Sequence, residues 1–170
     1  ATSSILKHEG DASAILSQIL ALTNIAIAAE QLGVAEKSLN LTVDYIAERK
    51  QFGRVVGSFQ GMKHKAADMM NKVEAARSAV YYAACIADEF LQGSTLGSEL
   101  EEAASIAKAY CCEAAFFNAG MALQMHGGVG FTWEYDVHLY FKRAKAAQVS
   151  FGDSTFHKEH IAKIALGESV

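Results

Sequence analysis

Apolar residues recur at alternating steps of three and four along residues 59–90. The positions are Phe59, Met62, Ala66, Met69, Val73, Ala76, Val80, Ala83, Ala87 and Phe90. These steps keep the side chains on one face of an α-helix, and a seam of this length is typical of helices in bundles. The charged residues Lys65, Asp68 and Lys72 lie off the seam. The segment is therefore predicted to form one amphipathic helix that packs along a single face.

The rest of the chain also favours helices. It contains no proline and its long segments are rich in alanine, so strands have little support. Helices are expected at about 12–48 after the start signal Gly10-Asp11, from an N-cap at Ser98 to the glycines of "HGGVGFT", at about 134–149 and at about 154–166. Gly33 is expected where another backbone comes close. This pattern predicts an all-α, antiparallel up-and-down bundle of four long helices and a short C-terminal helix.

The composition narrows the class of protein. A chain of 170 residues that is 51% hydrophobic can bury one core, and a formal net charge of -4 argues against a nucleic-acid binder. Three cysteines without metal-ligand or framework spacing indicate a reducing compartment and no structural metal. The most apolar window, residues 15–35, is interrupted by polar residues such as Gln18 and Gln31, so we expect a buried helix and no membrane span.

Two helix ends have compositions suited to an anion. In "ERKQFGRVVGSFQ", Arg49 could answer the helix dipole or make a bidentate contact to a pyrophosphate. In "QMHGGVGF", the glycines could only cap a helix or could let exposed amides approach a phosphate. Taken alone, each stretch is more typical of an ordinary helix end, but the two stretches together favour a ligand site. We expect His126 to face solvent, and His157 and His160 to lie on the surface or at an interface.

The stretches "ERKQFGRVVGSFQGMKHKAADM" and "QMHGGVGFTWEYDVHLYFKRAKA" resemble the two signature stretches of the C-terminal helical domain of flavin-dependent acyl-CoA dehydrogenases. Their spacing is similar to the family's, and the resemblance extends from about residue 12 to 167. Residues 1–170 are accordingly interpreted as a single helical domain of this type. The family's N-terminal helical domain and middle β domain are not in this sequence.

The resemblance implies an FAD site shared between subunits. The family's cofactor-binding positions fall on Arg49, Gln51, Phe52, Phe59, Gln60, Gln124, Gly127 and Gly128. In the family, the arginine contacts the FAD pyrophosphate across a subunit interface, and the glutamine-glycine element receives the adenosine end from a neighbour. The resemblance also implies an acyl-CoA thioester as substrate and a location in the bacterial cytoplasm. The implied partners are homologous subunits in a homo- or heterotetramer, and an electron-transfer flavoprotein or similar electron acceptor.

The sequence departs from the family at the catalytic base. Family members place a glutamate at one of two positions, and these fall here on Phe151, or on Gly152 if the gap moves by one, and on Thr23. A phenyl ring or a hydroxyl has no pKa near neutrality and cannot take the α proton of a thioester. Asp153 is the nearby candidate base, but an aspartate after glycine and before a helix is also a good N-cap.

Four functions remain open at the level of sequence. The chain resembles in kind a subunit of heteromeric bacterial acyl-CoA dehydrogenases of the steroid side-chain type, completing the FAD site while a paralogue carries the base. Alternatively, it is a self-sufficient flavoenzyme that uses Asp153, or a relative of flavin monooxygenases on the same fold. A further alternative is a flavin-free bundle that serves oligomerisation. No acyl-chain specificity is assigned.

Overall fold

The computed structural model describes residues 12–167, which form five α-helices and a small hairpin. The helices are α1 (Ala12–Glu48), α2 (Gln60–Leu91), α3 (Gly97–His126), α4 (Val137–Val149) and α5 (Ser154–Leu166). The hairpin strands are β1 (Lys50–Gln51) and β2 (Arg54–Val55), and the 3-10 turns are η2 (Val56–Ser58) and η3 (Gly127–Phe131). The expected all-α bundle is confirmed, although α4 has the same 13-residue length as α5 and is not a long helix. The start signal expected at residues 10–11 lies outside the described residues.

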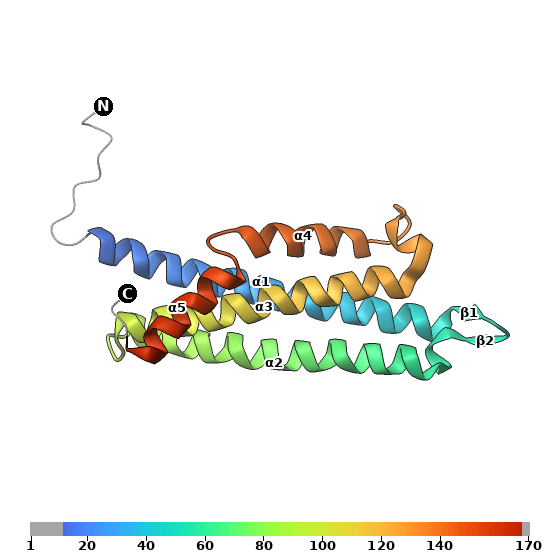
Figure 1. The fold of residues 1–170 in the computed structure, drawn as a ribbon, viewed down its shortest axis with the longest axis horizontal. Coiled ribbons are helices and arrows are strands. Elements are labelled where there is room, and N and C mark those ends of the chain that lie inside the picture. The colour runs from blue at the N-terminus through green and yellow to red at the C-terminus, as the bar shows by residue number, and fades with distance from the viewer. Residues whose placement is uncertain (1–11, 168–170) are drawn as a thin grey trace, which may run out of the picture.

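Of the three long helices, α2 runs antiparallel to α1 and α3, which run in the same direction, and α3 contacts every other helix (Figure 1). The β1-β2 hairpin joins α1 to α2 at one end of the bundle, and α3 ends on the same side (Figure 1). From there α4 returns along the bundle, and α5 then crosses toward the opposite end (Figure 1). The chain thus has a hairpin end, where α1 and α3 terminate, and an opposite end, where α2 leads into α3.

The core is built largely from small side chains. The middle of the predicted seam is buried from Met69 to Ala87, and its outer members Phe59, Met62 and Phe90 are half-buried because they lie near the ends of the bundle. On α3, alanines such as Ala107 and Ala115 are fully buried against α1 and α2. Alanine has high helix propensity and lets helix backbones approach closely, which explains three long helices packed with few large side chains.

A buried amide links the three long helices. Asn118 on α3 is fully buried, and its Nδ2 donates to Ala35 O on α1 at 3.2 Å and to Met69 O on α2 at 3.1 Å. Both acceptors are helix backbone carbonyls, so the side chain fixes the relative register of the three helices. A hydrogen bond of this kind is worth about 1 kcal/mol net, but leaving a buried donor unpaired costs about 1–3 kcal/mol.

Three local predictions are corrected. Ser98 is not the N-cap of α3: the cap is Leu96, whose side chain makes no capping bond, and the hydroxyl of Thr95 instead donates to Glu99 in the first turn. The fourth helix begins at Val137 and not at residue 134, because Thr132 and Tyr135 are held in turns. At Gly33, a Cβ would meet no atom within 4 Å, so no backbone approaches closely there.

Within residues 12–167, one helix, α1, is long and apolar enough to cross a membrane by length and composition. The core helix of a soluble protein passes the same test. In this structure α1 packs on α2 and α3 and buries polar side chains, among them Gln31, Ser38 and Thr42.

Candidate functional site

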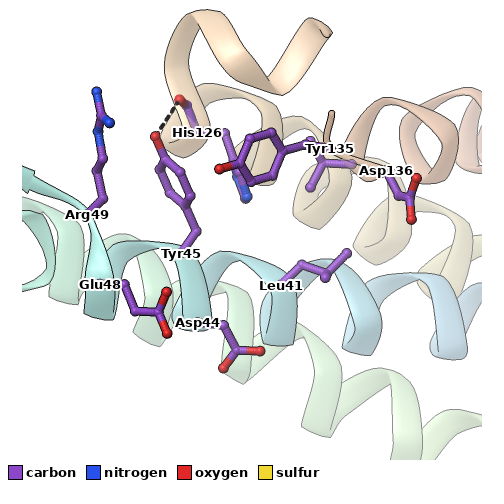
Figure 2. Close-up of a pocket in the computed structure, with 9 residues that line it drawn as sticks. Leu41, Asp44, Tyr45, Glu48, Arg49, His126, Tyr135 and Asp136 are labelled. Atoms are coloured by element: carbon purple, nitrogen blue, oxygen red, sulfur yellow. Dashed lines mark hydrogen bonds between the residues drawn. The ribbon is translucent and has the colours of Figure 1, made fainter. Parts of the chain in front are cut away.

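Arg49 lies where α1 ends, at the base of the β1-β2 hairpin. Its backbone N–H closes α1 by donating to Tyr45 O at 2.9 Å, and its carbonyl accepts from Val56 at 2.7 Å. The guanidinium is exposed and has no hydrogen-bond or ion-pair partner among residues 12–167. Figure 2 shows Arg49 and Tyr45 projecting from the same side of α1, toward the end of α3. This end therefore presents an unpaired cation.

The hairpin turn presents an exposed aromatic ring. Gln51 pairs with Arg54, and Phe52 and Gly53 between them have φ of 54° and 78°, which makes a two-residue turn with both residues left-handed. Asparagine and glycine are the usual residues at such turns, and a phenylalanine in this conformation costs about 1 kcal/mol or more. The Phe52 ring is 91% exposed, although it meets Phe59 edge to face at 6.3 Å between centroids.

A groove of about 370 Å³ borders this turn, lined by Gln51, Phe52, Val56, Phe59, Gly61, Met62 and Lys65. Three of the sequence-predicted cofactor residues, Gln51, Phe52 and Phe59, thus share one depression. Gln60, the first residue of α2, is exposed and does not line it. Sequence reasoning missed Arg54, whose guanidinium lies 3.8 Å from the centroid of the Phe59 ring.

Arg49 also lines a cavity of about 390 Å³ between the ends of α1 and α3 (Figure 2). Tyr45 stacks on His126 at 4.2 Å between ring centroids, and its hydroxyl donates to His126 O at 3.3 Å. Tyr135 meets both rings edge on. The rest of the lining consists of Leu41, Val137 and three carboxylates, Asp44, Glu48 and Asp136. The tyrosine contacts were missed because they join residues far apart in the sequence.

His126 was expected to face solvent, and that prediction is wrong. The side chain is buried, and its Nδ1 donates to Ala122 O at 2.7 Å, because a carbonyl can only accept. Burial lowers the pKa of His126 below its ordinary value. The tyrosine stack covers this ring, so the histidine acts here as part of the wall that holds the end of α3 against α1.

The glycine-rich end of α3 forms a third depression, of about 410 Å³, lined by Gly120, Leu123, Gln124, Gly127, Gly128, Phe131 and Phe141. Gly127 has φ of 67°, and its N–H donates to Leu123 and Gln124 carbonyls, so it is the C-cap of α3. A Cβ at Gly127 or Gly128 would meet no atom within 4 Å. The prediction that a glycine caps this helix is therefore confirmed for Gly127, and both glycines leave open space beside the backbone.

The hairpin end of the bundle thus gathers seven of the eight predicted cofactor residues into three neighbouring depressions. All of α2 and α3 separates Arg49 from the glycine turn in sequence, and the contact of Tyr45 with His126 brings them together. This arrangement suits a long anionic ligand, because it offers a cation, exposed aromatic rings and an open glycine backbone along one end.

The family base position that falls on Phe151 or Gly152 lies elsewhere, at the turn between α4 and α5. A cavity of about 380 Å³ is lined there by Ser17, Leu20, Ala21, Asn24, Glu101, Ala104, Ser105, Phe151, Gly152, Phe156, His157 and His160. Phe151 is a non-glycine residue with φ of 55°, and Gly152 follows with φ of 97°. Thr23 does not line the cavity, and its hydroxyl donates to Ile19 O at 2.8 Å within α1.

Asp153 is the N-cap of α5. Its Oδ1 accepts from Phe156 N at 2.9 Å, and the residue is not part of the cavity lining. The bond answers one of the unpaired N–H groups at the start of the helix. The capping interpretation of Asp153 is therefore confirmed.

Two buried polar side chains hold the α4-α5 turn, and sequence reasoning missed both roles. Lys108 on α3 is 1% exposed and its Nζ donates to Ala147 O and to Gly152 O, each at 3.1 Å. His157 is also buried, against the expected surface position, and its Nε2 donates to Phe151 O at 3.1 Å. Burial, and then the nearby Lys108 charge, lower the pKa of His157. Lys108 was detectable as a cation among apolar positions of α3.

The cavity beside this turn and the hairpin end are well separated. Ser105 lines the former and His126 the latter, and both lie on α3. Because an α-helix rises about 1.5 Å per residue, these two residues are roughly 30 Å apart along the helix. Within residues 12–167, no group of three His, Cys, Asp or Glu side chains is placed to hold a metal ion.

Residues 12–166 match the family model described as acyl-CoA dehydrogenase, C-terminal domain. The chain is 46% identical over 120 residues to the acyl-CoA dehydrogenase IpdE2 of Mycobacterium tuberculosis, an alignment that covers 71% of this chain and 34% of that protein. Its fold is similar to butyryl-CoA dehydrogenase from Megasphaera elsdenii, with a TM-score of 0.86 and 32% identity over 98% of this chain and 42% of that one.

It is also similar to a variant of the Tcur3481-Tcur3483 steroid ACAD, with a TM-score of 0.82 and 32% identity over 89% of this chain and 40% of that one. The chain therefore spans about a third to two fifths of the length of these relatives.

Proposed function

The chain belongs to the acyl-CoA dehydrogenase family, and from this membership we propose that it is a subunit, or a domain of a subunit, of an FAD-dependent enzyme that introduces an α,β double bond into acyl-CoA thioesters. In this proposal the chain completes an FAD site shared with a neighbouring subunit and does not carry the proton-abstracting glutamate. The enzyme acts in the bacterial cytoplasm and is reoxidised by an electron-transfer flavoprotein or similar acceptor.

The observation that carries the proposal is the convergence of Arg49 and the glycine turn at one end of the bundle. The Arg49 guanidinium has no partner among residues 12–167, so a pyrophosphate can take a bidentate contact without displacing another acid. The Gly127 N–H is engaged in capping α3, but a Cβ at Gly127 or Gly128 would meet no atom within 4 Å, so a ligand can approach the backbone closely there. The residues present thus fit an extended dinucleotide.

The proposal assigns the predicted cofactor-binding residues to different parts of FAD. Arg49 holds the pyrophosphate, Phe59 and Gln60 approach the adenosine side, and Gln51 and Phe52 belong to the same cofactor-binding stretch. The second element, with Gln124 and the glycines 127 and 128, receives the adenosine end of the cofactor that a neighbour holds. When bound, FAD supplies the acceptor for the hydride that leaves the β carbon of the acyl group. The roughly 30 Å between this end and the α4-α5 turn supports a chain that serves parts of two sites in an oligomer.

The missing base points to a partner subunit. Neither Phe151, Gly152 nor Thr23 can accept the α proton, and the carboxylate of Asp153 is engaged in capping α5. We therefore favour a heteromeric, two-plus-two assembly in which a paralogue supplies the base. The likeness to the Tcur3481-Tcur3483 steroid ACAD, a name that joins two components, supports this arrangement and a place in steroid or other lipid breakdown.

The proposal is tested by cofactor retention. The chain is purified alone and together with acyl-CoA dehydrogenase subunits encoded near it, and the visible absorbance of bound flavin and its bleaching by acyl-CoA are recorded. We expect flavin and bleaching only in the co-purified complex. An Arg49→Met complex should bind FAD roughly ten- to a hundredfold more weakly, because a hydrogen bond to a charged group is worth about 1.5–3 kcal/mol.

Arg49→Lys, which keeps the charge but loses the bidentate fork, should fall between the two. Lys163→Met is the matched control, since this cation is exposed on α5 and lines none of the three depressions. Retention of FAD by Arg49→Met at the wild-type level would contradict the assigned site. Absence of flavin from every complex would favour the oligomerisation bundle, and bleaching by the chain alone would favour a self-sufficient enzyme.

A further inference from the structure

The cavity beside the α4-α5 turn contains three buried or half-buried polar side chains that have no partner among residues 12–167. Asn24 comes from α1, Glu101 from α3 and His160 from α5. The rest of the lining is mostly apolar or small, including Leu20, Phe151 and Phe156. A volume of about 380 Å³ falls in the range of small-molecule sites, and a few convergent polar groups in an apolar pocket are the usual makeup of such a site.

Asn24 is the most informative of the three. Its side chain is 7% exposed, and its Oδ1 is buried without a hydrogen-bond partner. Its Nδ2 also makes no hydrogen bond to residues 12–167. An unpaired buried amide costs about 1–3 kcal/mol, so a side chain kept in this state at the wall of a cavity indicates a partner that the chain itself does not provide.

The other two groups are unpaired as well. Glu101 is half-buried and takes part in no ion pair or hydrogen bond within the described part of the chain. The Nε2 of His160 is buried without a partner. By contrast, the neighbouring His157 is satisfied, with Nδ1 3.3 Å from Ser105 Oγ and Nε2 bonded to Phe151 O. Among the buried and half-buried polar side chains of the lining, Asn24, Glu101 and His160 are therefore the ones without a partner among residues 12–167.

Resting on the function proposed above, we propose that this cavity receives an acyl group that carries a hydroxyl substituent, and that Asn24, Glu101 and His160 select it. A hydroxyl both donates and accepts, so it can donate to the buried Asn24 Oδ1 or to the Glu101 carboxylate and accept from an N–H of Asn24 or His160. The apolar residues Leu20, Phe151 and Phe156 pack the carbon skeleton.

Other substituents match these groups less well. A carboxylate on the acyl group is repelled by Glu101 and cannot donate to Asn24 Oδ1, and an ammonium can donate to both acceptors but cannot accept from the N–H groups of Asn24 and His160. A ketone only accepts and leaves the glutamate unpaired, and a plain alkyl chain leaves all three groups unpaired inside an apolar pocket. A site built to hydrogen-bond a hydroxyl rejects the analogue that lacks it, because its own polar groups then stay buried and unsatisfied.

The test compares binding of octanoyl-CoA with binding of its 6-, 7- and 8-hydroxy derivatives to the intact complex, by titration calorimetry. These positions leave the α and β carbons unchanged. We expect at least one hydroxy derivative to bind ten- to a hundredfold more tightly than octanoyl-CoA. Asn24→Leu and Glu101→Leu should each reduce that preference at least fivefold, and should leave or improve the binding of octanoyl-CoA.

Glu102→Leu is the matched control: this carboxylate is the next residue on α3, is also half-buried, and does not line the cavity. It should leave the preference unchanged. Equal binding of octanoyl-CoA and all three derivatives, or a preference that survives both cavity variants, would overturn the proposal. The flavin content of the same samples reads the cofactor site separately. A complex that contains flavin but shows no preference for the hydroxy derivatives would contradict only the hydroxyl proposal. A complex that shows the preference but contains no flavin would contradict only the proposed FAD site.

Discussion

Replacing Lys108 with methionine tests whether a buried cation stabilises the α4-α5 turn. The Nζ of Lys108 donates to Ala147 O in the last turn of α4 and to Gly152 O in the turn itself, at 3.1 Å each. Methionine has nearly the same length and helix propensity, so the substitution removes the two hydrogen bonds and the charge with little change in packing.

The expected loss follows from these two bonds. Each hydrogen bond to a charged group is worth about 1.5–3 kcal/mol, so the pair contributes roughly 3–6 kcal/mol. Two effects reduce the loss: removing the ammonium relieves its desolvation, and Ala147 O still accepts from Ser150 N at 3.3 Å. Gly152 O, in contrast, has no other hydrogen-bond donor among residues 12–167. We expect Lys108→Met to lower the free energy of unfolding by about 2–4 kcal/mol.

Urea unfolding at neutral pH, followed by circular dichroism, measures this difference. Lys63→Met is the control, because Lys63 is exposed and its side chain contacts no partner among the described residues, and its effect should stay within about 0.5 kcal/mol. A Lys108→Met protein as stable as the wild type, or more stable, would refute the reasoning. It would mean that desolvation of the buried ammonium offsets both hydrogen bonds.

Three further predictions concern the same fold. Gly152→Ala should lower the free energy of unfolding by about 1–3 kcal/mol in the same urea assay, because its φ of 97° strains any other residue and its Cβ would lie 2.5 Å from a ring carbon; an unchanged midpoint would contradict this. Burial lowers the folded-state pKa of His126 and His157 below 6.5, so the unfolded chain binds more protons below that value. The contribution of the two histidines to the free energy of unfolding should be fully present above about pH 6.5 and should fall as the pH drops toward their folded-state pKa values. The loss is up to about 1.4 kcal/mol per pH unit for each histidine, and equal urea midpoints at pH 7 and 5.5 would exclude this effect. Cys85 is exposed and should react quickly with a thiol reagent, whereas burial raises the pKa of Cys111 to about 12, so Cys111 should react only after unfolding; rapid reaction of every thiol in the native protein would be inconsistent with this.

The periodic features of the sequence were sufficient to predict most helices. The seam from Phe59 to Phe90 identified α2 and its buried face, since side-chain direction along a helix depends only on spacing. The N-cap role of Asp153 was also readable, because a cap bonds to a backbone N–H three residues away. Helix starts were less well predicted: α4 begins at Val137 because turns at Thr132 and Tyr135 hold the preceding residues.

The candidate site was likewise predictable from the sequence only in part. The sequence identified Arg49 and the glycines at residues 127 and 128 as two separate helix ends, each with a plausible capping role. Their common position became apparent only from the stacking of Tyr45 on His126, a contact between residues 81 apart. For the same reason, His126 was expected in solvent: no local pattern indicates that an aromatic ring from another helix covers it.

By itself, then, the sequence determined the fold class, the helices and the residue types at each helix end, because these depend on spacing and on bonds between near neighbours. Only the tertiary structure decided which ends meet, that Lys108 reaches across to Gly152 O, and that Asn24, Glu101 and His160 line one cavity without partners among residues 12–167. Those relations depend on the packing of helices distant in sequence, and burial then sets the cost of each unpaired polar group.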